Sequence, residues 1–190
     1  MKIVLFVEGS SDKETLSILA KRISPEYGIV TRVLGRGNLL NAQRISVYIE
    51  EDIKKQYRDV RKVLLCVDSE CTPEREWERT VAPVRRALTD LVRHPPVFYC
   101  AVIHATEAWL ACDAATLGLH LGSVMIKESS ARAIARACKP KRALDDLFNR
   151  HDREFSNIRD NPRLAREVNI EVLTRNSKSF SRFARLVRNP

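Results

Sequence analysis

The sequence contains no apolar run close to the roughly 20 residues that a membrane-spanning helix needs. The apolar run after Lys2 is short, and it meets Glu8 where a cleavable signal would need small residues. Internal repeats and low-complexity tracts are also missing. We therefore expect a cytoplasmic protein without a membrane partner, built as one globular unit from its 190 residues.

Paired metal-binding or redox motifs are missing as well. The five cysteines include no CxxC pair, and the four histidines are scattered along the chain. Zinc sites usually contain close Cys and His pairs. Cys66 and Cys100 lie in strand-like runs, where a free cysteine behaves as a small hydrophobic residue. We therefore expect all five cysteines to be reduced and structural.

The sequence also lacks the common phosphate-binding loops. No GxxxxGK[ST] motif is present, and Gly35 and Gly37 do not complete a dinucleotide fingerprint because Leu40 stands where the third glycine is needed. This argues against a nucleotide-binding site of either type. Arg36 in the same loop remains a candidate contact to the phosphate of a nucleic acid.

Apolar and β-branched runs predict strands at residues 3–7, 29–34, 62–67 and 97–104, and helical periodicity follows at 12–22, 39–57 and 74–92. This order predicts an α/β fold with a mostly parallel sheet of about four strands and helices on both faces. From Thr106 the chain reads as helical to its end, with breaks near 118–122, 139–140 and 161–162. We expect a core over 1–125 and a basic helical extension over 126–190 that packs on it.

Positive charge is concentrated in this extension. Residues 126–190 contain 16 Lys and Arg against eight Asp and Glu, so they carry +8 of the total net charge of +9. A basic segment of this kind attracts polyanions, with DNA or RNA as the first candidates. A solvated helical surface without a ligand is the alternative.

Carboxylates stand at the predicted ends of two strands. Glu8 follows the first strand, Asp12 lies one helical turn later, and Asp68 and Glu70 follow the third strand. Clustered carboxylates repel one another unless a cation neutralises them, and Mg²⁺ or Mn²⁺ is the ion that prefers oxygen ligands. The pattern therefore predicts a metal site for phosphoryl transfer. Taken singly, Asp12 is also a common first-turn residue, Asp68 a turn former and Glu70 a loop acid.

The segments VEGSSD and VDSE, which contain these acids, resemble the Toprim domain of topoisomerases, bacterial primases and nucleases of the overcoming-lysogenization-defect type. The resemblance implies that Glu8 is a general acid or base and also belongs to the metal site. It further implies that Asp68 and Glu70 bind metal, and that Asp12 is the second acid of the nuclease branch. Glu70 stands where many relatives carry aspartate, and its longer side chain can still bind a metal.

A narrower resemblance covers nearly the whole chain. TEAWLACD at 106–113, the Lys-Pro-Lys at 139–141 and the closing RNSKSFSRF are similar to small stand-alone Toprim-like proteins known as a domain of unknown function. This similarity implies that Glu107, Trp109 and Asp113 lie in a segment beside the site, with Glu107 as a further ligand. Trp109 itself reads more readily as a core residue than as a stacking platform.

The sequence as a whole predicts a phosphodiesterase dependent on Mg²⁺ or Mn²⁺, with nuclease or nicking activity. Phage defence is the expected context, and an operon-encoded protein is a candidate partner. The alternatives are a non-catalytic Toprim-like module that binds nucleic acid or a protein, and phosphoryl transfer on a small nucleotide. The residues expected to contact nucleic acid are Arg36, Lys139, Lys141, Arg142, Lys178, Arg182 and Arg185.

Overall fold

The computed structural model describes residues 1–35, 37–92 and 94–189. These residues form a sheet of four parallel strands in the order β2-β1-β3-β4, which confirms the predicted α/β fold. The strands are β1 (Lys2–Val7), β2 (Gly28–Val33), β3 (Val60–Asp68) and β4 (Val97–Val102). Right-handed crossovers through helices are the usual way to connect such parallel strands.

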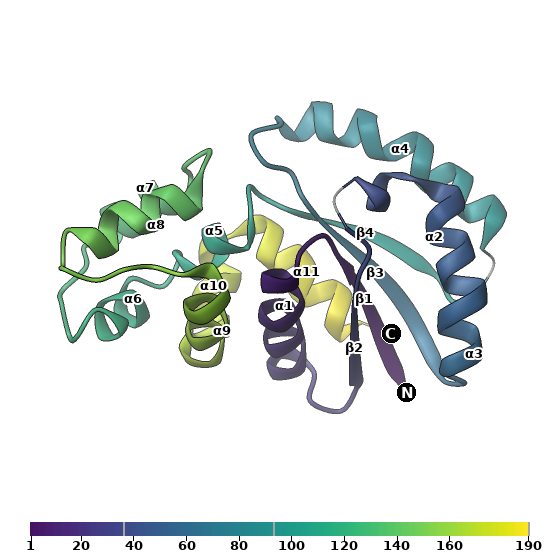
Figure 1. The fold of residues 1–190 in the computed structure, drawn as a ribbon, viewed down its shortest axis with the longest axis horizontal. Coiled ribbons are helices and arrows are strands. Elements are labelled where there is room, and N and C mark those ends of the chain that lie inside the picture. Colours follow the sequence, from purple (N-terminus) through teal and green to yellow (C-terminus); the bar gives the residue numbers. More distant parts are fainter. Residues whose placement is uncertain (36, 93, 190) are drawn as a thin grey trace.

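Helices lie on both faces of the sheet, as predicted (Figure 1). The helices between the strands are α1 (Ser10–Ile23), η1 (Asn38–Leu40), α2 (Ala42–Tyr48), η2 (Ile49–Ile53), α3 (Lys54–Gln56) and α4 (Glu74–Leu91). After β4 come α5 (Thr106–Leu110), α6 (Ala114–His120), α7 (Glu128–Ala135), α8 (Pro140–Asn149), α9 (Asn157–Glu167), α10 (Ile170–Asn176) and α11 (Lys178–Arg188). None of the described helices is long and apolar enough to cross a bilayer.

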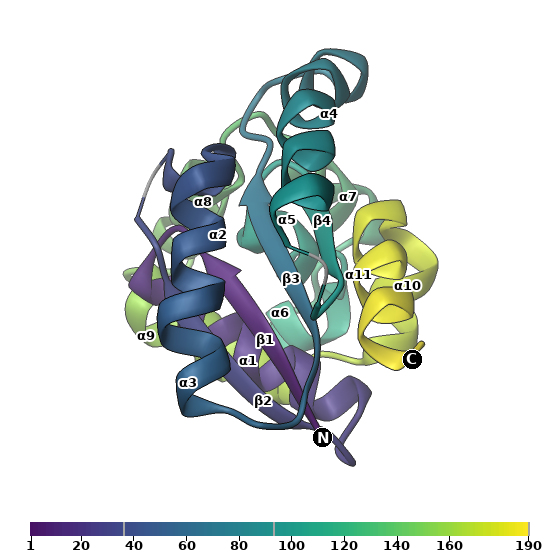
Figure 2. The same ribbon diagram turned by 90° about the vertical axis from the view of Figure 1, so that its right-hand side faces the viewer.

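The alternation of side chains along the central strands divides the core into two layers. Ile3, Leu5 and Val7 of β1 point into one layer with α1 and α11, whereas Val4 and Phe6 point into the other with α2 and α4. The first layer continues without interruption into the helices after α5. The described part of the basic extension, residues 126–189, therefore shares a core with β1 and α1, and Figure 2 shows α11 beside the sheet.

Two details of the helical prediction are wrong. The helix expected over 39–57 is divided, because the side chain of Asn41 accepts a hydrogen bond from the Arg44 amide at 3.0 Å and so caps a new helix, α2. The break expected at Asn161 and Pro162 is absent, since Pro162 lies inside α9. Buried Leu164 and neighbouring core residues anchor this helix, and packing of this kind outweighs the local cost of proline.

Candidate functional site

Glu8 directly follows β1, and Asp68 is the last residue of β3, the hydrogen-bonded neighbour of β1. Phe6 of β1 pairs with Leu65 of β3, so the residues that follow both strands emerge at the same edge of the sheet. Helix α1 begins at Ser10, directly after Glu8, and places Asp12 in its first turn. The structure therefore brings three of the predicted site residues to one edge.

The electrostatics of Asp68 show how closely the acids gather. Burial is the main cause that raises the pKa of Asp68 well above its usual value. Other carboxylates raise it further, and they belong to Asp12, Glu107, Glu8 and Glu70. Every acid that we predicted for the metal site thus acts on Asp68.

Asp12 lies in the same electrostatic environment. Burial raises the pKa of Asp12 from 3.8 to about 6. A hydrogen bond from the Thr106 hydroxyl to Oδ1 at 2.9 Å opposes this rise, whereas the carboxylates of Glu107 and Glu8 add to it. The side chain of Asp12 is therefore partly protonated near neutral pH in the metal-free protein. A site that holds protons in this way is one that a divalent cation can neutralise instead.

Glu107 reaches this site from the first turn of α5 and is only 6% exposed. The side-chain amide of Asn161 on α9 donates a hydrogen bond to Glu107 Oε1 at 2.8 Å. Asn161 is fully buried, and its Oδ1 has no hydrogen-bond partner within the described structure. A buried oxygen without a partner carries a desolvation cost, which a water molecule or a cation beside Glu107 would remove.

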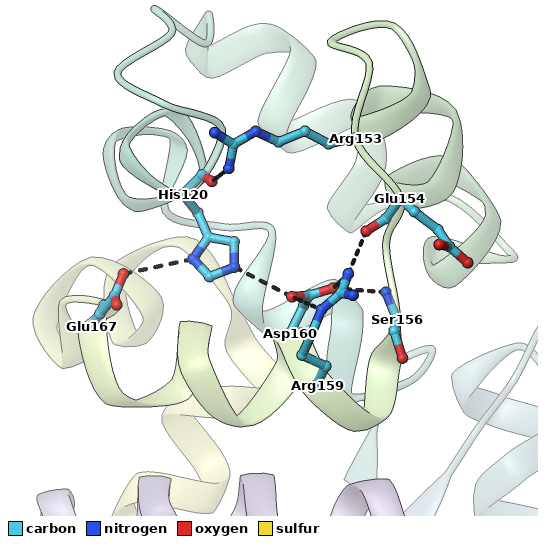
Figure 3. A network of polar contacts seen from close by, with 7 residues as sticks. All are labelled: His120, Arg153, Glu154, Ser156, Arg159, Asp160 and Glu167. Atoms are coloured by element: carbon cyan, nitrogen blue, oxygen red, sulfur yellow. Dashed lines mark hydrogen bonds and ion pairs between the residues drawn. The ribbon is translucent and has the colours of Figure 1, made fainter.

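A polar network holds the start of α9, and with it Asn161, against α6 (Figure 3). His120 lies between two carboxylates, 3.6 Å from Asp160 Oδ1 and 3.7 Å from Glu167 Oε2. Burial favours a higher pKa for Asp160, but hydrogen bonds from Arg159 and the Ser156 amide hold that pKa below its usual range. The network therefore supports α9 as a positioning element for Asn161 and Glu107.

Glu8 connects the acidic edge to the loop after β2. The backbone amide of Gly37 donates a hydrogen bond to Glu8 Oε1 at 3.2 Å. Gly37 has a φ of 76°, a left-handed conformation that glycine adopts without a steric cost. The contact therefore depends on glycine at this position. Arg36, which we predicted as a phosphate contact in this loop, lies outside the described residues.

Glu70 stands apart from the other acids because its side chain is exposed. Its φ of 48° is left-handed, so the extended segment that would align Glu70 with Asp68 does not continue this far. The Glu70 amide donates to the His104 carbonyl at 2.9 Å, and His104 Nδ1 lies within hydrogen-bond distance of the Glu70 carbonyl. These backbone contacts join the loops that follow β3 and β4.

The chemistry of this acidic group suits Mg²⁺ or Mn²⁺. Between described residues, no Lys or Arg forms an ion pair with Glu8, Asp12, Asp68 or Glu107. Carboxylate oxygens are the ligands that these hard cations prefer. However, no three acids, histidines or cysteines in the described part of the chain are already arranged as a metal-binding group.

Six of the predicted basic residues lie on two helices, α8 and its N-cap, and α11. Lys178 and Arg182 line a cleft of about 560 Å³, while Arg185 is exposed one turn farther along α11. Lys139, Lys141 and Arg142 are exposed at the start of α8.

The expectation of five reduced cysteines is wrong. Cys71 and Cys138 form a disulfide, whereas Cys66, Cys100 and Cys112 are free and buried. The two bonded cysteines are 67 residues apart in the sequence, and the fold brings the loops after β3 and α7 together. This bond places the basic start of α8 next to the loop that carries Glu70.

The other residues of the TEAWLACD segment have structural contacts. Trp109 is fully buried against Phe180 and Phe183, and its Nε1 donates to Ser179 Oγ at 2.7 Å. This confirms that Trp109 is a core residue. Asp113 caps α6 through the Thr116 amide and also accepts from the amide of Asn169. The carboxylate of Asp113 therefore braces the helical layer.

A comparison with family models matches residues 7–188 to a domain of unknown function, DUF4276. The chain belongs to the DUF4276 family. The match extends from β1 into α11, so the DUF4276 domain includes both the acidic edge and the basic helices. Neither the curated proteins nor the solved structures that were compared with this DUF4276 chain gave a match.

Two residues of the DUF4276 site were not predicted from the sequence. Thr106 was visible as the neighbour of Glu107, but only the fold shows that its hydroxyl reaches Asp12. Asn161 is 54 residues from Glu107 and lies beside a proline that suggested a helix break. No local pattern indicates such a contact.

Proposed function

We propose that this protein hydrolyses phosphodiester bonds in DNA or RNA with the help of Mg²⁺ or Mn²⁺. The observation that carries the proposal is the group formed by Glu8, Asp12, Asp68 and Glu107, none of which forms an ion pair with a Lys or Arg among the described residues. Such a concentration of negative charge at the carboxyl ends of parallel strands is costly for folding. A bound divalent cation would remove that cost and supply a Lewis acid for phosphate oxygens.

The residues that would hold the cation are Glu8, Asp12, Asp68, Glu107 and Glu70. Asp68 and Asp12 are the central pair, because each feels both Glu8 and Glu107. Glu70 lies at the exposed margin of the group. The side-chain amide of Asn161 donates a hydrogen bond to Glu107 Oε1 and so fixes the orientation of the Glu107 carboxylate. Asn161 therefore acts as a positioning residue.

Glu8 is the residue that we propose for proton transfer. The Gly37 amide holds Oε1, which leaves Oε2 to accept a proton from an attacking water molecule. The phosphodiester would be held against repulsion from the acids by basic side chains of α8 and α11. The resemblance to Toprim nucleases supports the same assignment of roles.

The test is cleavage of end-labelled single-stranded DNA, duplex DNA and RNA, and of supercoiled plasmid, by the purified protein. Wild type should cut at least one substrate in Mg²⁺ or Mn²⁺ and none in EDTA. Glu8→Gln and Asp68→Asn should lose about 100-fold or more of this rate, the size expected for a lost acid–base residue. Two exposed acids, Glu26 and Asp90, provide the matched controls Glu26→Gln and Asp90→Asn, which should cut as wild type does.

Absence of cutting on every substrate, together with intact folding and nucleic-acid binding, would contradict the proposal. That result would favour a non-catalytic binding module. The presence of Glu70 in place of aspartate is also compatible with this alternative. Equal cutting by wild type and Asp68→Asn would show that the reaction takes place elsewhere or comes from a contaminant.

A further inference from the structure

The cleft that Lys178 and Arg182 line adjoins the acidic site through helix α5. The cleft of about 560 Å³ that contains Lys178 and Arg182 is enclosed by the start of α4, the end of β4 and parts of α5, α7, α10 and α11. Ala108 lines it, whereas Thr106 and Glu107, in the same turn of α5, contact Asp12 and Asn161. A single helical turn therefore separates the cleft from the acids, and Figure 1 shows α5 between the sheet and the outer helices.

The cleft carries an excess of positive charge on one side. Its acidic residues are Glu74 and Glu78 on α4. Its basic residues, all from the opposite helices and their connections, are Arg132, Arg136, Arg175, Lys178 and Arg182. Arg182 forms an ion pair with Glu78 at 3.7 Å. The other four basic residues form no ion pair with any described residue. Several cations without partners facing one cleft favour an anionic ligand.

The rest of the cleft surface is apolar or neutral. Trp77, Ile103 and Ala108 provide an apolar wall, and the neutral polar groups of Asn176, Ser177 and Ser179 come from the α10–α11 junction. The volume lies in the range of about 300 to 1,000 Å³ that small-molecule sites usually have. A ligand that suits both surfaces has a flat, weakly polar part and an anionic part. A nucleoside phosphate has this composition.

We propose that the cleft binds one nucleoside phosphate unit, with its base and sugar against Trp77 and Ile103 and its phosphate against Arg132, Arg136 and Arg175. The proposal rests on the proposed function for the type of substrate and specifies where a neighbouring nucleotide is held. A nucleic-acid strand with one nucleotide in the cleft would pass over α5 and present the adjoining phosphodiester to Asp68 and Glu8. The same chemistry would also accept a free mononucleotide.

The test is binding in EDTA, where no metal-dependent cleavage interferes. We would titrate the protein with a fluorescein-labelled 12-nucleotide single strand, measured by anisotropy, and with a free nucleoside monophosphate, measured by quenching of tryptophan fluorescence. Trp77 lines the cleft with a 5% exposed side chain, whereas the chain's other tryptophan, Trp109, is 0% exposed and lies outside the lining. Trp77→Phe should therefore remove most of the quenching while preserving the fold.

The double variant Arg132→Ala/Arg136→Ala should weaken binding by about 10-fold or more, because the loss of even one charged hydrogen bond to phosphate usually costs about that factor. Its salt dependence should fall by about one unit of slope for each phosphate contact that is lost. The control is Arg58→Ala/Arg163→Ala, which removes the same charge from exposed positions outside the cleft.

The proposal is supported if the 12-nucleotide strand, the nucleoside monophosphate or both bind and if that binding depends on the cleft arginines. Comparison of the two affinities shows whether the bound nucleotide belongs to a strand or is free. Unchanged affinity in Arg132→Ala/Arg136→Ala for both ligands, or affinity lowered equally by the control pair, would overturn it. Asp68→Asn should bind at least as tightly as wild type in EDTA. A protein that binds through the cleft but cuts nothing would therefore contradict the proposed activity and leave the cleft assignment standing.

Discussion

Replacement of Asp12 by Asn should stabilise the metal-free protein at neutral pH. In wild type, burial and the carboxylates of Glu107 and Glu8 raise the pKa of Asp12 from 3.8 to about 6. A folded-state pKa above the unfolded value means that the folded state holds the proton more tightly. The stability that this provides is fully present below pH 3.8 and is lost as the pH rises through 6.

The size of the effect follows from the shift. A pKa difference of about two units corresponds to about 3 kcal/mol of stability lost at pH 7.5. Asp12→Asn avoids this loss and keeps an Oδ1 that accepts from the Thr106 hydroxyl. It weakens the contact with the Gly9 amide and the favourable interaction with the α1 dipole, which together cost about 1–2 kcal/mol. The expected net gain is about 1–2 kcal/mol, or roughly 3–6 °C in Tm for a chain of this length.

The assay is thermal unfolding by circular dichroism in EDTA at pH 7.5 and pH 3.5, with Asp90→Asn as the exposed control. Asp12→Asn should melt higher than wild type at pH 7.5, and its advantage should disappear at pH 3.5. Added Mg²⁺ should raise the Tm of wild type more than that of Asp12→Asn. A variant that melts lower than wild type at pH 7.5 in EDTA would refute the reasoning, because it would show that a cation of the protein already compensates the charge of Asp12.

Three further outcomes are expected. Asn161→Ala should lower the free energy of unfolding by about 2–3 kcal/mol in urea titrations, since it leaves the buried Glu107 carboxylate without its donor and opens a cavity; an unchanged midpoint would contradict that contact. Gly37→Ala meets no neighbouring atom, but its left-handed φ should cost about 1–2 kcal/mol, whereas an Ala that is tolerated without loss would show that this loop changes conformation. Alkylation of the unfolded, unreduced protein should label three cysteines by mass spectrometry and five after reduction; five labels in both samples would exclude the Cys71–Cys138 bond.

The sheet could be predicted because its signals are local. The apolar runs that contain Leu5 and Leu64 face helices on both sides, so they read as buried parallel strands without reference to the rest of the chain. The acids after these strands could be placed for the same reason, since parallel neighbours end at a common edge. Glu70 departs from that prediction because a left-handed turn follows Asp68 directly.

Contacts between distant segments could not be predicted in this way. The pairing of Cys71 with Cys138 and the contact of Asn161 with Glu107 both depend on how the helices after β4 fold back on the sheet. Helical periodicity indicates that such helices exist and which faces are apolar, but it contains no information on which loops they bring together. The cleft beside α5 is formed by the same packing.

Binding of a divalent cation by the carboxylates around Asp68 is the central claim, and it can be measured directly by electron paramagnetic resonance of Mn²⁺. Titration of Mn²⁺ into metal-free protein at pH 7.5 should show saturable loss of the free-ion signal. Asp68→Asn should abolish this loss, and Asp90→Asn should retain it. Equal Mn²⁺ uptake by wild type and Asp68→Asn, or no uptake by either, would contradict a metal site at the ends of β1 and β3.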